Sequence, residues 1–169
     1  MRVHPALVPK SDPLAHVDGA LNAVAIQGTM VGPSFLSGLG AGAAPTATSV
    51  AGDIVDIARN LLADAPMRTW YLPVEEEKEL QSIDDLSSRY YLRFSVRDES
   101  GVLASLSGKL GDAGISIDRM RQYGHVKDTA QVLIVTHKTN RADIDHALAA
   151  CAATSVVSGD PVALRIEEV

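Results

Sequence analysis

The sequence has 169 residues, of which 46% are apolar, and a formal net charge of −6. No apolar run is long enough to span a bilayer, and no basic stripe with interleaved aromatic residues occurs, so we expect neither a membrane nor a nucleic acid as partner. Residues 1–88 hold 11 acidic and 5 basic residues, whereas residues 89–169 hold ten of each. This step in charge predicts a boundary near residue 88.

The first 16 residues contain three prolines and no apolar segment of the kind found in signal peptides. They predict an extended entry segment and no secretion. The single cysteine, Cys151, excludes an intrachain disulfide and is typical of a reducing compartment, so we expect a cytoplasmic protein. Because Cys151 falls in phase with the apolar face of a helix, it is interpreted as a core residue rather than a nucleophile.

The first half of the chain predicts a hairpin followed by a helix. Leu21–Gln27 and residues 34–38 read as strands, with turn chemistry between them. A glycine-rich loop over residues 38–46 leads into a helix with Pro45 near its start. Four apolar residues recur at spacings of four, three and four, which predicts one buried stripe. They are Val50, Ile54, Ile57 and Leu61.

The next segment, residues 64–88, reads as an acidic linker. It carries Pro66, Pro73 and the run 75–77 of three glutamates. These glutamates are interpreted as solvated. Trp70 and Tyr71 are expected to dock the linker on a neighbouring surface.

The second half predicts one complete βαββαβ unit. Apolar residues alternate from Tyr90 to Val96, as in a half-buried strand, and the next apolar stripe, Val102, Leu103, Leu106 and Leu110, has helical spacing. Strands are then expected over residues 115–123 and 130–137. A helix capped by Asn140 follows, and a strand over residues 162–166 closes the unit. Ile144, Leu148 and Cys151 form the predicted core face of that helix. This order is that of an α+β, ferredoxin-like fold with two helices on one face of an antiparallel sheet.

Several motifs carry a family resemblance. The segments 90–94, 98–104 and 114–117 resemble an ACT domain, a regulatory amino-acid-binding module, and residues 132–137 are similar to the ACT domain of bacterial homoserine dehydrogenases. Residues 3–5, 17–23, 38–47 and 49–59 resemble the end of the catalytic region of that enzyme. The resemblance divides the chain into a catalytic-domain remnant at 1–63, a linker at 64–88 and an ACT domain at 89–169.

The resemblance implies NAD- or NADP-dependent interconversion of aspartate semialdehyde and homoserine, in threonine, methionine and isoleucine biosynthesis. In the family, a Rossmann domain holds the dinucleotide, and lysines with acidic partners handle substrate and protons. The G-x-G-x-x-G fingerprint does not occur in these 169 residues, and Lys10 reads as a solvated loop residue. We therefore expect no catalytic residue in this chain, no cofactor bound by it alone, and no activity.

The glycine-rich loop is one candidate binding segment. Glycines let a backbone approach a ligand, and the following helix presents free N–H groups. The resemblance implies that Gly40, Gly42 and Thr46 lie near the cofactor in the intact enzyme. An ordinary strand-to-helix turn remains the alternative.

The turn at residues 98–103 is the second candidate. Gly101 frees the backbone, and helix-start amides such as those of Val102 and Leu103 are suited to an amino-acid carboxylate. The resemblance implies an effector, expected to be L-threonine, bound between Asp98, Gly101, Val102 and Leu103 of one ACT domain and the start of the second strand of a paired one. That start comprises Gly114, Ile115 and Ser116.

Two positions depart from the family pattern. The family often has proline where this chain has Ser100, and effector-binding members often have asparagine where it has Ser116. A hydroxyl cannot offer the donor and acceptor of an amide together. A pairing module that binds nothing therefore stays open as the alternative.

The remaining predictions concern metals and assembly. The five histidines are scattered, so no metal site is predicted. ACT sheets leave unpaired edges, which favours a homo-oligomer. Two functions remain open: the C-terminal part of a homoserine dehydrogenase, and a free-standing regulatory protein that binds an amino acid.

Overall fold

The computed structural model describes residues 3–63, 82–126 and 128–167. Residues 10–79 belong to one compact unit, and residues 80–168 together with residues 1–9 belong to the other. The predicted docking of Trp70 and Tyr71 and the glutamate run 75–77 lie outside the described residues. None of the described helices combines the length and apolar character needed to cross a bilayer.

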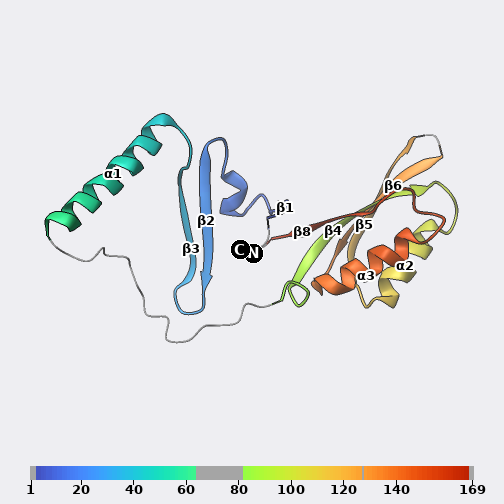
Figure 1. Ribbon diagram of the computed structural model, residues 1–169. Helices are drawn as coiled ribbons and strands as arrows, with labels where there is room; N and C mark the ends of the chain where they lie inside the picture. Colours follow the sequence, from blue (N-terminus) through green and yellow to red (C-terminus); the bar gives the residue numbers. More distant parts are fainter. Residues whose placement is uncertain (1–2, 64–81, 127, 168–169) are drawn as a thin grey trace. The chain divides into compact units, whose positions relative to one another are not determined.

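The larger unit is an antiparallel sheet with two helices on one face (Figure 1). Its elements are β4 (Ser87–Arg97), α2 (Val102–Asp112), β5 (Ile117–Val126), β6 (Thr129–Thr136), β7 (Thr139–Asn140), α3 (Arg141–Ala152) and β8 (Val162–Ile166). The strand order β8-β4-β6-β5 places the two strands joined through α2 on either side of β6. The predicted ferredoxin-like βαββαβ fold is confirmed.

The core of this unit follows from the alternation in β4. Tyr90, Leu92, Phe94 and Val96 are buried, and the residues between them are exposed or half-buried. Successive side chains of a strand point to opposite faces, so one face of β4 meets the helices. Burial of each large apolar side chain contributes about 1.5–3 kcal/mol. The core therefore lies between the sheet and the two helices.

The helices complete that core with one correction. Val102, Leu106 and Leu110 of α2 are buried as predicted, and Ile144 and Cys151 of α3 are buried too. Leu103, however, is 40% exposed, so its assignment to the stripe is wrong. Leu103 follows Val102 directly, and successive residues of an α-helix are rotated by about 100° around its axis, so the Leu103 side chain does not point to the core.

The sheet has one strand that the sequence did not predict. β1 (Ala6–Leu7) pairs in parallel with β8, with Ala6 opposite Arg165. Glu167 N also donates a hydrogen bond to Leu7 O at 2.8 Å. The predicted segment 1–63 therefore contributes a short edge strand to the sheet of the larger unit.

The smaller unit contains the predicted hairpin and helix. β2 (Leu21–Gly28) pairs antiparallel with β3 (Gly32–Leu39), and α1 spans Ala43–Leu62. A short 3₁₀ helix at Pro13–His16 precedes them, and Asp12 Oδ1 accepts a hydrogen bond from Leu14 N at 2.9 Å. Hairpin and helix agree with the prediction.

The stripe on α1 is helical but not buried. Ile54 is 61% exposed and Leu61 is 77% exposed, and none of the described residues of α1 is buried. The spacing of these apolar residues correctly predicts a helix, but the prediction that they are buried is wrong. A two-stranded hairpin offers too little surface to cover a helix of this length, so the face stays open within this chain.

Candidate functional site

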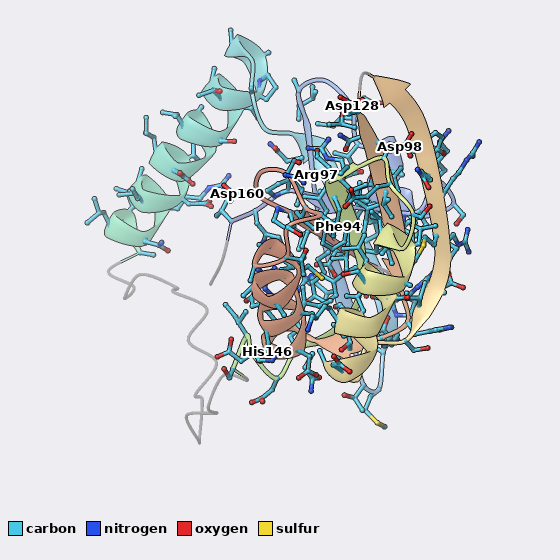
Figure 2. The ribbon with its side chains drawn as sticks, turned by 90° about the vertical axis from the view of Figure 1, so that its right-hand side faces the viewer. Phe94, Arg97, Asp98, Asp128, His146 and Asp160 are labelled. Carbon is cyan, nitrogen blue, oxygen red and sulfur yellow. The ribbon has the colours of Figure 1, made fainter. Side chains whose placement is uncertain are left out.

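The turn between β4 and α2 is held at its start by one backbone and one side-chain hydrogen bond to the β5–β6 hairpin. Asp98 N donates a hydrogen bond to Asp128 O at 3.0 Å, and Gln122 Nε2 donates to Asp98 Oδ1 at 3.4 Å. Figure 2 shows Asp98 and Asp128 at one end of the sheet, away from His146. Asp98, the first residue after β4, is thus fixed by hydrogen bonds to the sheet of the same chain.

Gly101 allows the chain to enter α2. Its φ of 90° lies in the left-handed region, where a Cβ is strained, and it occupies the N-cap of the helix. The first helical hydrogen bond runs from Ser105 N to Gly101 O at 2.9 Å. The amides of residues 102–104 precede it and have no partner within the helix, so they form the donor set expected for a carboxylate.

The side chains at this turn are divided between core and solvent. Val102 packs into the core, whereas Leu103, Glu99 and Ser100 are exposed. Val102 can therefore offer a ligand only its amide, because its side chain is already buried. Leu103 can offer both its amide and an apolar surface.

The turn after α2 uses most of its amides to close the helix. Gly114 N donates to Gly111 O and Ile115 N donates to Leu110 O, both at 2.9 Å. Gly114 has a φ of 72°, as helix C-caps require, and the Ile115 side chain is buried. Ser116 is exposed. Ligand contacts from this turn therefore fall mainly to Ser116.

The two turns are at opposite ends of α2. The helix has 11 residues, which separates its ends by about 16 Å at 1.5 Å per residue. The structure does not bring Gly101 and Ser116 of one chain together. A site that uses both turns requires a second copy of the unit.

A charged cluster that the sequence analysis missed lies beside Ser116. His137 N donates to Ser116 O at 2.9 Å, and Asp118 Oδ2 accepts from Arg89 Nη2 at 2.6 Å and from Arg119 Nε at 3.1 Å. Desolvation raises the pKa of the Asp118 carboxyl. The Arg119 hydrogen bond and the charges of Arg119, Arg89 and His137 outweigh this effect and hold the pKa below its usual value. Nothing in the spacing of Arg89 and Asp118 could have signalled a pair that spans 29 residues.

The glycine-rich loop forms the entry to α1. Gly40 N donates to Ala20 O at 3.0 Å, and a Cβ on Gly40 would clash with Asn22 Nδ2. Gly42 has a φ of 123° at the N-cap of α1, and Thr46 N donates to Gly42 O at 3.2 Å. Gly42 therefore has a conformational reason to be glycine, and the Thr46 amide already belongs to the helix.

Neither a metal site nor a reactive thiol is found in the described part of the chain. No group of three or more His, Cys, Asp or Glu residues there could hold a metal ion. Cys151 is fully buried in the core. Burial raises the pKa of its thiol, and the charge of Lys109 opposes this effect only in part, so the group stays a neutral core residue.

Comparisons with known proteins match both units. A family model described as homoserine dehydrogenase matches residues 1–55, and one described as ACT domain matches residues 90–152. A homoserine dehydrogenase of Neisseria gonorrhoeae is 38% identical over 172 residues, which are 99% of this chain and 40% of that protein. The solved homoserine dehydrogenase of Thiobacillus denitrificans has a TM-score of 0.83 and 36% identity, over 99% of this chain and 38% of that one. Nearly the whole chain is thus similar to homoserine dehydrogenases, and its second unit matches the ACT-domain model.

The homoserine dehydrogenase relatives are longer than this chain. The protein of Mycobacterium leprae is 39% identical over 175 residues, and again only 38% of its length is covered. The chain therefore spans about two fifths of the curated relatives that it matches. The homoserine dehydrogenase match includes Gly40, Gly42 and Thr46, and the ACT match includes the turns at both ends of α2.

Proposed function

We propose that this chain corresponds to the C-terminal part of a homoserine dehydrogenase and supplies its regulatory unit. The intact enzyme interconverts L-homoserine and L-aspartate 4-semialdehyde with NADP or NAD. The observation that carries this proposal is the similarity to homoserine dehydrogenases over 98–99% of the chain, through both units. In the intact enzyme, Gly40, Gly42 and Thr46 lie close to the dinucleotide.

The regulatory ligand is an amino acid, and L-threonine is the specific candidate. Its carboxylate binds the amides at the start of α2, where Gly101 opens the backbone and the helix dipole favours an anion. Ser116 of a second copy contacts the same ligand, because one chain holds the two turns about 16 Å apart. Asp98 and Leu103 border the site on the first copy, and Gly114 and Ile115 shape the turn that presents Ser116.

Pairing of two sheets supplies the second copy. Among the described strands, β5 is an outer strand of the sheet and pairs only with β6. An outer strand presents unpaired N–H and C=O groups to another chain. We therefore expect a homo-oligomer formed through the ACT sheets.

Calorimetry of the 169-residue chain with L-threonine tests the effector site. Saturable heat is expected, with an increase in oligomer size by light scattering. Ser116→Ala should weaken binding, and Ser155→Ala, an exposed serine in the turn after α3, is the matched control. No heat together with an unchanged oligomer would overturn the effector site.

Activity is expected to require more than this chain. The G-x-G-x-x-G fingerprint and the family's catalytic lysines do not occur in the 169 residues. The purified chain should therefore neither oxidise homoserine with NADP or NAD nor bind either nucleotide. Measurable turnover by the chain alone would contradict this.

A free-standing amino-acid-binding regulator is the second candidate. It is favoured by the closed core of the larger unit, whose buried apolar residues all lie between Tyr90 and Cys151. The DNA upstream of Met1 separates the two candidates. An in-frame stretch that encodes a Rossmann domain supports the enzyme, and a promoter directly before Met1 supports the independent regulator.

A further inference from the structure

A pocket lies in the larger unit between residues 4–5, which precede β1, the strand β8 and the start of α3. Its volume is about 370 Å³, near the lower end of the range of about 300–1,000 Å³ for small-molecule sites. The polar residues that line it are His4, Tyr90, Arg141 and Arg165. None of the residues in either turn at the ends of α2 lines this pocket, so it is separate from the proposed effector site.

Strand register brings two arginines together there. Arg165 lies directly opposite Tyr90 in the β4–β8 pair, so both side chains are on the face of the sheet that meets the helices. Arg141, the first residue of α3, places its guanidinium 6.0 Å from the centre of the Tyr90 ring. Two permanent positive charges therefore border one pocket.

Each guanidinium has one carboxylate partner, but not every donor is used. Arg141 donates to Asp145 through Nε at 2.9 Å and Nη2 at 2.6 Å, and Arg165 pairs with Glu167 through Nη2. Arg165 Nε is shielded from solvent and has no hydrogen-bond partner among the residues that the structure describes. A buried charged donor without an acceptor is unfavourable, which favours an incoming acceptor at this atom.

The rest of the lining selects the kind of anion. Five apolar residues complete it: Pro5, Ile83, Leu86, Ala163 and Leu164. They offer a surface for a short hydrocarbon body, which inorganic phosphate lacks. Among the described residues, no aspartate or glutamate lines the pocket, so an ammonium group would lose its hydration without gaining a partner of opposite charge in this lining.

We propose that this pocket binds a small organic carboxylate that carries no amino group. The carboxylate accepts a hydrogen bond from Arg165 Nε and is attracted by Arg141, and its hydrocarbon body lies against Leu86 and against Ala163, which is on the same face of β8 as Arg165. The site differs in ligand class from the amino-acid site proposed at the start of α2. Either site can therefore fail without the other.

Calorimetric titration of the full 169-residue chain with four probes tests the ligand class. Butyrate is expected to bind saturably in the millimolar range or tighter. L-2-aminobutyrate, butylamine and inorganic phosphate should bind this pocket at least about tenfold more weakly. Butylamine lacks the carboxylate, phosphate lacks the apolar body, and L-2-aminobutyrate carries an ammonium group for which the lining offers no carboxylate. Equal binding of phosphate would overturn the ligand class, and so would equal binding of L-2-aminobutyrate that Arg165→Met weakens, because such binding does not come from the amino-acid site at α2. No saturable binding of butyrate would overturn the site.

Variants test the assigned atoms. Arg165→Met should weaken butyrate binding about tenfold or more, because it removes a charge-assisted hydrogen bond. Arg93→Met is the matched control: Arg93 lies in β4 next to Leu92, is exposed, and lies on the opposite face of the sheet. It should leave butyrate binding unchanged. Equal losses in the two variants would contradict a specific role of Arg165.

A spectroscopic readout on the unaltered chain covers the case in which Arg165→Met does not fold. The Arg165 Nε–H signal in a ¹H–¹⁵N spectrum, assigned by its loss in Arg165→Lys, should shift saturably with butyrate. Butylamine should leave it in place. If butyrate binds while this signal does not move, the carboxylate is not at Arg165 and the proposal is wrong.

Discussion

Arg89 Nη2 lies 2.6 Å from Asp118 Oδ2, in an ion pair that joins β4 to β5 past the strand between them. Arg89 Nε also donates to Thr136 O of that middle strand at 3.4 Å. One guanidinium therefore connects three strands next to Ser116. The pair fixes the start of β5, from which the second half of the proposed effector site is presented.

This ion pair predicts a pH-dependent contribution to stability. Because the pKa of Asp118 is lowered in the folded chain, its carboxylate stabilises the fold above the unfolded-state pKa of about 3.9, and the contribution is lost as the pH falls below that value. Asp118→Asn should therefore lower the urea midpoint at pH 7 and have a smaller effect at pH 3. Asp160→Asn, at an exposed carboxylate before β8, is the control. A deficit of equal size at both pH values would exclude the ion pair as its cause.

The core of the larger unit predicts a large effect for Phe94. Its side chain is fully buried between the sheet and the helices. Phe94→Ala should lower the free energy of unfolding by about 3–5 kcal/mol, since it removes apolar contacts and leaves a cavity. Arg93→Ala, one residue away and exposed, should change it by less than about 0.5 kcal/mol. Urea unfolding followed by far-UV circular dichroism measures both values.

Two glycines around α2 predict opposite responses to the same substitution. Gly101 has a φ of 90°, so Gly101→Ala should cost about 1–2 kcal/mol through backbone strain. Gly108 lies inside α2, and a Cβ there would meet no atom within 4 Å. Gly108→Ala should therefore stabilise the chain by about 0.4–1 kcal/mol. Thermal unfolding of both variants is the measurement, and stabilisation by Gly101→Ala would contradict the strained turn.

Local pattern was sufficient to predict most of the larger unit. The alternation from Tyr90 to Val96 and the spacing of Val102, Leu106 and Leu110 encode both the element type and its buried face. Asn140 does occupy the N-cap of α3, but its side chain makes no capping hydrogen bond. The position of a cap depends on local sequence, whereas its bonding depends on side-chain geometry that the sequence does not reveal.

Contacts between distant segments were not predictable in this way. Two residues are too few to show the alternating pattern of a strand, and β1 is a strand only because it pairs with the edge of β8. Arg165 reads as an ordinary polar residue in a short strand, and its pocket arises because residues 4–5 and Arg141 come to line it from distant parts of the chain. The two effector turns were each recognisable, but their separation by the length of α2 became evident only from the fold.

The open face of α1 predicts self-association through the smaller unit. Ile54 and Ile57 are exposed on a helix whose apolar residues recur at core spacing. Exposed apolar patches of this kind find partners or aggregate. The double substitution Ile54→Lys and Ile57→Lys should reduce concentration-dependent light scattering and binding of a hydrophobic dye. Asp53→Asn with Asp56→Asn raises the net charge by the same two units on the same helix outside that stripe and keeps the isoleucines. If this control reduces scattering equally, net charge and not the apolar face governs association.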